Sequence, residues 1–191
     1  MGFKRNRDNA TYGGGEIRHL PSGLYVAQII RCVDNEKPKF NKSPRFEFEY
    51  DICQGEYTDF FKEEYDGFSS RSSNAFWTGT FVQNYTGKSA GYMDALINRF
   101  EDSNPSFRYV DNGGRCFEGF KIIVSIQAQE EERNGYKSWR YRVMNTYSTK
   151  EAKDKQDVNG NPLRIYEDVA LKEEPKKTAT KFDINDDDIQ F

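Results

Sequence analysis

The stretch from Arg45 to Ile52 reads RFEFEYDI, and its strict alternation decides the class of fold. Aromatic or aliphatic residues occupy every second position, and charged residues occupy the positions between them. Successive side chains of a strand point to opposite faces, so this stretch has one apolar face and one charged face. It predicts a strand that covers a core, with Phe46 and Phe48 inside that core.

Two further strands are predicted around this one. Leu24 to Val33 (LYVAQIIRCV) alternates and is rich in β-branched residues, which predicts a strand before it. Gln54 and Gly55 turn the chain, and Tyr57 to Lys62 (YTDFFK) predicts a third, shorter strand. Residues 24–62 are therefore expected to form a three-stranded meander.

The second half of the chain predicts one helix and two more strands. Residues 63–87 are rich in Gly, Ser and aromatic residues and show no regular pattern. Lys88 to Phe100 predicts a helix, because apolar residues recur at helical spacing and form one core-facing stripe. Gly119 to Gln127 and Tyr136 to Tyr147 predict two strands, joined by an acidic hairpin loop at residues 130–135. The stripe consists of Met93, Leu96, Ile97 and Phe100.

Three strands, a helix and two strands is the element order of an OB-fold, a small five-stranded barrel. We therefore expect a mainly β, OB-fold-like barrel over residues 21–150, with one helix between strands three and four. A β-sandwich is the main alternative. Residues 1–20 are predicted to be a flexible basic arm, and residues 151–181 a partly ordered linker. Residues 182–191 are predicted to be a disordered acidic tail.

Charge is distributed unevenly along the 191 residues, whose net charge is -3. Residues 1–150 hold 21 basic and 20 acidic residues, whereas residues 151–191 hold 7 and 11. Aromatic residues make up 15% of the chain, more than a core of this size needs. The asymmetry indicates different partners for the body and for the tail.

The cysteines and the single histidine restrict the classes of site. Cys32, Cys53 and Cys116 are widely spaced, and no Cys-x-x-Cys pair is present, which excludes a zinc finger and disfavours a disulfide framework. A reduced, cytoplasmic environment is expected. The start of the chain lacks the apolar region of a signal peptide, and no apolar run approaches the roughly 20 residues of a membrane span.

No catalytic activity, cofactor or metal is expected. His19 stands alone near a flexible end, so a nucleophile activated by histidine is disfavoured. Glu47, Glu49 and Asp51 line one strand face, and such a row can bind Mg²⁺ in nucleases. A solvated strand face is the favoured interpretation of that row.

A surface that binds single-stranded DNA without reading its sequence needs cations for the phosphates and flat rings for the bases. Three groups of residues interleave both. Trp139 and Tyr141 share one face of their strand, so each either stacks on bases or packs in the core, and the loop lysines are either phosphate contacts or ordinary solvated charges. The groups are Lys37, Lys39, Phe40, Lys42 and Arg45 in the first hairpin loop, then Arg71, Phe76 and Trp77, and finally Lys137, Trp139, Arg140, Tyr141 and Arg142 on the last strand.

The last ten residues, Phe182 to Phe191, read FDINDDDIQF. Consecutive aspartates do not suit a core strand, where each carboxylate needs a partner, or the end of a helix, where the dipole repels anions. The stretch is therefore interpreted as an exposed peptide whose apolar end and terminal carboxylate dock on a partner protein. The residues expected to bind that partner are Asp186, Asp187, Asp188, Ile189 and Phe191.

This ending resembles the acidic tip of bacterial single-stranded-DNA-binding proteins, a run of aspartates followed by Ile, Pro and a final Phe. Gln190 stands where that tip has proline. Residues 21–137 also resemble a family of small phage proteins close to single-stranded-DNA-binding proteins. That likeness rests on Leu20 to Tyr25 (LPSGLY), on Gly55-Glu56-Tyr57 followed by Phe60-Phe61, on Ser103-Asn104, and on Gly119 before an apolar strand.

The resemblance implies a phage protein that binds single-stranded DNA during replication or recombination, in the cytoplasm of an infected bacterium. It also implies that the tip recruits replication or recombination proteins. The alternative is an interaction module without DNA, a phage adaptor or inhibitor that presents its tail to a host protein. A homo-oligomer is compatible with the sequence, which does not fix the number of subunits.

Overall fold

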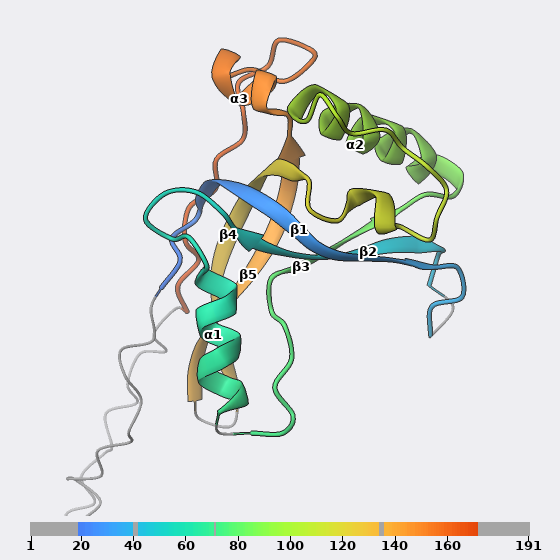
Figure 1. The fold of residues 1–191 in the computed structure, drawn as a ribbon. Coiled ribbons are helices and arrows are strands. Elements are labelled where there is room, and N and C mark those ends of the chain that lie inside the picture. The colour runs from blue at the N-terminus through green and yellow to red at the C-terminus, as the bar shows by residue number, and fades with distance from the viewer. Residues whose placement is uncertain (1–18, 40–41, 71, 134–135, 172–191) are drawn as a thin grey trace, which may run out of the picture.

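The computed structural model describes residues 19–39, 42–70, 72–133 and 136–171. One antiparallel sheet in the order β3-β2-β1-β4-β5 curls into a nearly closed barrel (Figure 1). Helix α2 (Ala90–Ser103) lies between the third and fourth strands, so the predicted mainly β, OB-fold-like architecture is confirmed. The strands are β1 (Gly23–Asn35), β2 (Arg45–Ile52), β3 (Thr80–Asn84), β4 (Lys121–Arg133) and β5 (Tyr136–Tyr147).

The curl of the sheet comes from β1, which pairs with two strands over different parts of its length. Residues Gly23 to Gln28 pair with β4, and residues Ala27 to Asn35 pair with β2. Register shifts interrupt the β1–β2 pairing between Ile29 and Arg31 and the β4–β5 pairing between Val143 and Asn145. Such bulges bend a strand and increase its twist, so the sheet can wrap around its own core. The two edge strands, β3 and β5, are thereby turned toward each other.

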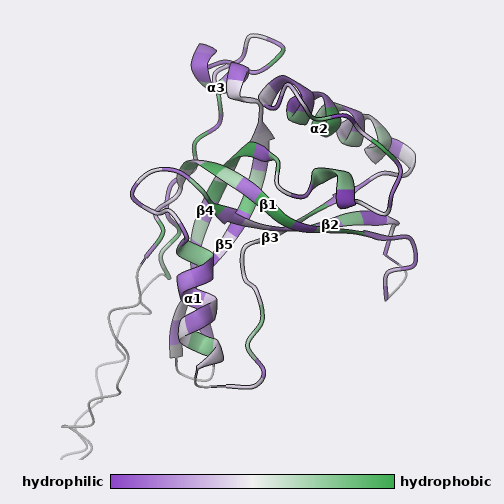
Figure 2. Cartoon of the chain, in the orientation of Figure 1, coloured by the Kyte–Doolittle hydropathy of each residue, from purple (hydrophilic) through white to green (hydrophobic). Residues whose placement is uncertain are grey.

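The core is filled by the alternating residues of the strands. Phe46, Phe48, Tyr50 and Ile52 of β2 are all buried, which confirms the inward face predicted for that strand. The same alternation is visible as green and purple bands along the strands in Figure 2. Helix α2 lies above the sheet in Figure 1 and packs its apolar stripe on this core, as predicted. The buried residues of that stripe are Met93, Leu96 and Phe100.

The third strand is not where the sequence predicts it. Tyr57 to Asp59 forms a turn and Phe60 to Lys62 begins helix α1 (Phe60–Ser69). The third strand lies instead in the stretch with no regular pattern. The reason is a contact between the end of β2 and the start of α1. The Asp51 carboxylate accepts hydrogen bonds from the backbone N–H groups of Phe61, at 2.9 Å, and Lys62, at 3.1 Å. Those groups belong to the first turn of α1, where backbone donors lack partners within the helix.

The second hairpin is longer than predicted. Residues 130–133, expected in a loop, continue β4 and pair with β5, where Glu130 lies opposite Trp139 and Glu132 opposite Lys137. After β5, a short helix α3 (Thr149–Asp154) that the sequence analysis did not predict begins with a capping box between Ser148 and Glu151.

Residues 163–171 run beside β4 after α3. The backbone N–H of Glu130 donates to the carbonyl of Val169 at 2.8 Å, and the N–H of Val169 donates to the carbonyl of Ala128 at 2.9 Å. Phe40, Arg71, most of the predicted arm and the whole predicted acidic tail lie outside the described residues. Among the described helices, none has the length and apolar character that crossing a bilayer requires.

We expect Asp51→Ala to lower the free energy of unfolding by about 2–3 kcal/mol, because it leaves buried backbone donors without an acceptor. Asp51 is only 7% exposed, and its carboxylate also accepts the N–H of Ile52. Burial raises the pKa of this carboxyl, and its three backbone hydrogen bonds oppose that rise. Urea denaturation measures the effect.

Glu49→Ala is the matched control on the same strand. Glu49 lies on the outward face and pairs with the exposed Arg31 at 3.3 Å. Its replacement is expected to change the free energy of unfolding by no more than about 1 kcal/mol. Equal losses in the two variants would contradict the role given to Asp51.

Candidate nucleic-acid interface

A groove of about 1070 Å³ opens where the barrel does not close, between β3 and β5. Residues Thr80 to Gln83 of β3 form one wall, and residues Ser138 to Thr146 of β5 form the other. Two of the three predicted groups meet here, although about 60 positions separate them in the sequence. The predicted residues that line the groove are Phe76, Trp77, Trp139, Arg140, Tyr141 and Arg142.

The aromatic residues of the groove differ in how much of each ring is exposed. Phe76 is 74% exposed. Trp77 is half-buried, and its Nε1–H donates to the carbonyl of Tyr50 at 3.0 Å, which fixes the ring. Trp139 is also half-buried and packs partly against the core. Among the predicted residues, these three rings are therefore the ones able to meet a base.

Tyr141 is a core residue, so of the two predicted roles, base stacking and core packing, it has the second. Its ring is 8% exposed and makes edge-to-face contacts with Phe60 and Phe61 of α1. Its hydroxyl oxygen accepts the backbone N–H of Leu20 at 3.3 Å. Burial raises the pKa of this hydroxyl to about 12. Tyr141 reaches the groove wall but supports the barrel beneath it.

The cations of the groove are arginines held by glutamates. Arg140 and Arg142 both approach Oε1 of Glu131, at 3.3 Å and 3.6 Å. Arg99 of α2 lies 3.2 Å from Glu151 of the α3 capping box. Because three arginines and one glutamate line the groove, its lining is positive although the whole chain is acidic.

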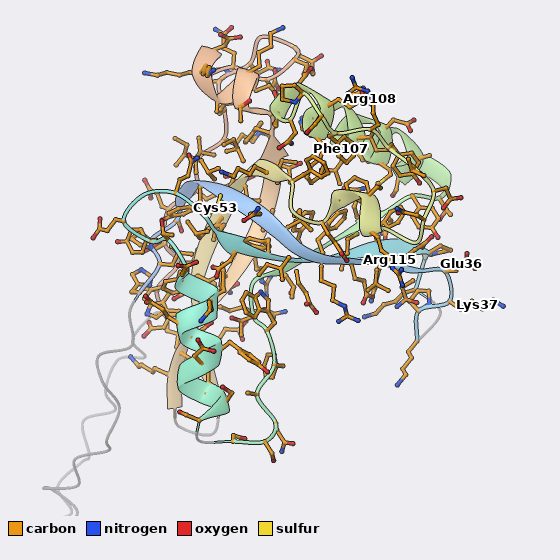
Figure 3. The ribbon with its side chains drawn as sticks, viewed as in Figure 1. Glu36, Lys37, Cys53, Phe107, Arg108 and Arg115 are labelled. Atoms are coloured by element: carbon orange, nitrogen blue, oxygen red, sulfur yellow. The ribbon has the colours of Figure 1, made fainter. Side chains whose placement is uncertain are left out.

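The loop lysines do not line this groove. Lys37, Lys39 and Lys42 are exposed in the β1–β2 loop, and Figure 3 shows Lys37 pointing away from the barrel. Arg45 is half-buried and bonded to Glu47 at 2.6 Å. This loop nevertheless adjoins one end of β3, where Asn84 pairs with Arg45. It therefore lies beyond the groove residue Gln83, along the same strand.

Sequence reasoning missed several groove residues, among them two on α2 and those of β3. Tyr92 and Arg99 lie seven positions apart on α2, outside its core stripe, and Tyr92 is largely exposed. The sequence did contain a sign of these two residues: a tyrosine and an arginine two helical turns apart, both outside the apolar stripe of the predicted helix. The β3 residues gave no signal, because the strand itself was not predicted.

The row of acids on β2 has structural partners. Glu47 accepts from Arg45 and Asn35, Glu49 pairs with Arg31, and Asp51 holds the start of α1. Within the described part of the chain, no three Asp, Glu, His or Cys side chains are gathered in a way that would hold a metal ion.

A second, smaller cavity of about 370 Å³ has the opposite charge. Asp34, Glu36, Asp94 and Asp111 line it, and the Tyr85 hydroxyl donates to Asp34 at 2.7 Å. Burial and that hydrogen bond raise the pKa of Tyr85 to about 12. A polyanion is repelled by four carboxylates, so the groove between β3 and β5 is the candidate interface.

The segment before β3 is anchored to α1 and to β2. The Thr78 hydroxyl donates to the Glu64 carboxylate, and the Gly79 carbonyl accepts the N–H of Tyr50 at 2.8 Å. Burial raises the pKa of Glu64, and the bond from Thr78 partly offsets that rise. These contacts set where Phe76 and Trp77 enter the groove.

Comparison with known proteins does not place the chain in a family. No protein-family model matches the sequence, and no curated protein matches it either. What the chain does must therefore be argued from the groove and its residues.

We expect Gly79→Ala to lower the free energy of unfolding by about 1–3 kcal/mol, because an added methyl group finds no room there. A Cβ at this position would lie 2.4 Å from the carbonyl oxygen of Tyr50 and 2.7 Å from the ring of Phe61. The segment that carries Trp77 must then move, which near-ultraviolet circular dichroism detects.

Gly67→Ala is the control. A Cβ at Gly67 in α1 meets no atom within 4 Å, so this change is expected to stabilise the protein by up to about 1 kcal/mol. A Gly79→Ala protein as stable as the unaltered one would show that the close packing of this segment is not required.

Proposed function

We propose that this chain binds single-stranded DNA in the groove between β3 and β5, with little sequence preference. One observation carries the proposal: two groups of aromatic and basic residues, far apart in the sequence, line one positive groove. Aromatic rings stack on any base, and arginines bind any phosphate, so such a lining does not depend on sequence. Each stacked base contributes about 1–3 kcal/mol.

The arginines are suited to phosphate by their present partners. Arg140 and Arg142 share one glutamate, Glu131, so their guanidinium groups are held near the same carboxylate oxygen before a ligand arrives. A guanidinium group can bind two oxygens of one phosphate through two parallel N–H···O hydrogen bonds, as it binds a carboxylate. A DNA phosphate would compete with Glu131 for the arginines. The affinity for DNA would fall as the salt concentration rises, because binding releases counterions from the phosphates.

Unpaired DNA suits the groove better than a duplex. Phe76, Trp77 and Trp139 offer ring faces or edges, and the base faces of a duplex are stacked on one another and unavailable. The strand would follow β3 from Trp77 toward Asn84, where the lysines of the β1–β2 loop lie next along its path. Lys37, Lys39 and Lys42 would then contact phosphates outside the groove.

We further propose that residues 182–191 recruit replication or recombination proteins. The support is the resemblance of this tip, and of residues 21–137, to single-stranded-DNA-binding proteins of bacteria and phages. The tip holds four aspartates, so it would not itself be drawn to DNA.

The alternative remains an interaction module without DNA that presents its tail to a host protein. One observation gives such a module a second contact, a peptide bound at the barrel. β3 and β5 are edge strands with no strand partner on their groove side within the described part of the chain. An extended peptide adds to such an edge by backbone hydrogen bonds. A peptide held in this way would block the groove to oligonucleotides.

The double variant Arg140→Ala/Arg142→Ala is expected to bind a fluorescent oligo-dT about tenfold more weakly. The slope of log affinity against log salt should become shallower by about 1–2, because up to two phosphate contacts are lost. Fluorescence anisotropy at several salt concentrations gives both quantities.

The control double variant is Arg108→Ala/Arg115→Ala, which removes the same charge from exposed positions outside the groove. Figure 3 labels both residues. Its affinity and salt slope are expected to stay close to those of the unaltered protein. Equal losses in the two double variants, or a salt-independent affinity, would rule out the groove as the site.

Deletion of Phe182–Phe191 is expected to leave the affinity for oligo-dT unchanged or tighter. The deletion removes four negative charges and none of the groove residues. The same anisotropy titration measures it, and a large loss of affinity would contradict the division between a DNA-binding body and a recruiting tip.

A further inference from the structure

The only histidine of the chain lies against the groove tryptophan. The ring centroids of His19 and Trp139 are 4.1 Å apart, with an angle of 37° between the ring planes. Trp139 lines the groove, whereas His19 does not. His19 therefore touches Trp139 from behind the groove wall.

Asp168 holds the imidazole of His19 in place. The distance from His19 Nε2 to Asp168 Oδ2 is 2.7 Å, and the backbone N–H of Ser22 donates to Asp168 Oδ1 at 2.6 Å. Burial acts to raise the pKa of Asp168, but the hydrogen bonds from His19 and Ser22 outweigh it and hold the pKa below its usual range. A carboxylate can only accept, so Nε2 of His19 carries the proton that the two share.

Asp168 is itself fixed to the barrel. Val169 pairs with β4 through two backbone hydrogen bonds, and the N–H of Leu171 donates to Glu130 at 3.0 Å. Glu130 lies directly opposite Trp139 in the β4–β5 ladder. The segment that supports His19 is therefore tied to the same pair of strands that carries Trp139.

The imidazole has few other restraints. Its Nδ1 is buried and has no hydrogen-bond partner among the described residues. The next residue, Leu20, is fully buried and anchors the backbone beside His19. The ring is thus set mainly by Asp168 and Trp139, with a more distant ring contact to Tyr141 at 6.5 Å between centroids.

We propose that His19 and Asp168 are positioning residues that fix the ring of Trp139 for base stacking. The inference rests on the proposed function, since it concerns how the same groove meets a base. A ring that is fixed before binding loses less side-chain freedom when a base stacks on it. Asp168 acts through His19, and His19 acts through Trp139, without either touching the DNA.

A test without DNA uses the two tryptophans of the chain. Labelling with 5-fluorotryptophan gives one fluorine resonance for each, and the variant Trp139→Phe assigns them. His19→Ala and Asp168→Ala are expected to move or broaden the resonance of Trp139 and to leave that of Trp77 in place. A Trp139 resonance unchanged in both variants would overturn the proposal.

A test with DNA is a double-mutant cycle on the affinity for oligo-dT. His19→Ala alone is expected to weaken binding about three- to tenfold, which is the size of a lost aromatic contact. In a protein that already carries Trp139→Ala, the same change is expected to have no further effect. Losses that simply multiply would show that His19 does not act through Trp139.

Two more variants separate positioning from general stability. His19→Phe keeps a ring beside Trp139 and is expected to recover part of the lost affinity. Asp66→Ala breaks another short ion pair, between Lys62 and Asp66 at 2.6 Å on α1, and is expected to change neither affinity nor the Trp139 resonance. An Asp66→Ala effect equal to that of Asp168→Ala would overturn the proposal.

The two proposals fail in different ways. An unaltered protein that does not bind oligo-dT overturns the proposed function, and the fluorine spectra still decide whether His19 and Asp168 fix Trp139. Binding of oligo-dT with no effect of His19→Ala overturns the positioning role alone.

Discussion

The unequal length of the two edge strands is the constraint on which the groove depends. β5 has twelve residues, whereas β3 has only five. A strand this short cannot pair along a long neighbour and close the barrel. The space that a longer β3 would fill is lined instead by side chains of both edges, by α2 and by the segment before β3. The candidate interface is thus a part of the barrel that stays open.

The contacts of the preceding segment explain where β3 begins. Trp77 bonds to the carbonyl of Tyr50, Thr78 bonds to Glu64, and Gly79 packs too closely on Tyr50 for any larger residue. The chain enters the sheet only after these three contacts. The same contacts place two aromatic residues at the groove, so the start of the strand and the lining of the groove have one cause.

Patterns with a fixed period were the parts of the fold that the sequence predicted well. In both β2 and α2 one face is buried, and the apolar residues of that face recur at the spacing of a strand or a helix. That spacing can be read from the sequence alone. The third strand was misplaced because Asp51, at the end of β2, accepts the first backbone N–H groups of α1. No local pattern in Tyr57 to Lys62 carries that information.

The sequence predicted several residues of the candidate site, but it did not predict how they are arranged in space. Arg140, Arg142 and Trp139 were found by composition, and the alternation of β5 could not say which face looks inward. The structure puts Tyr141 in the core and shows that the lysines of the first loop stand apart from the arginines. Their arrangement follows from the order of strands in the sheet, which residue spacing does not contain.

The bond between His19 and Asp168 joins residues 149 positions apart, and the first residues of β1 find their partners only in β4. A ribosome delivers the chain from its N-terminus, so most of it has been synthesised before the sheet can be completed. Until β4 has been synthesised, the edge of β1 that pairs with it has no partner strand, and unpaired edges of this kind favour aggregation. Long-range pairing of this kind also slows folding, so the native barrel is expected to form after synthesis rather than during it.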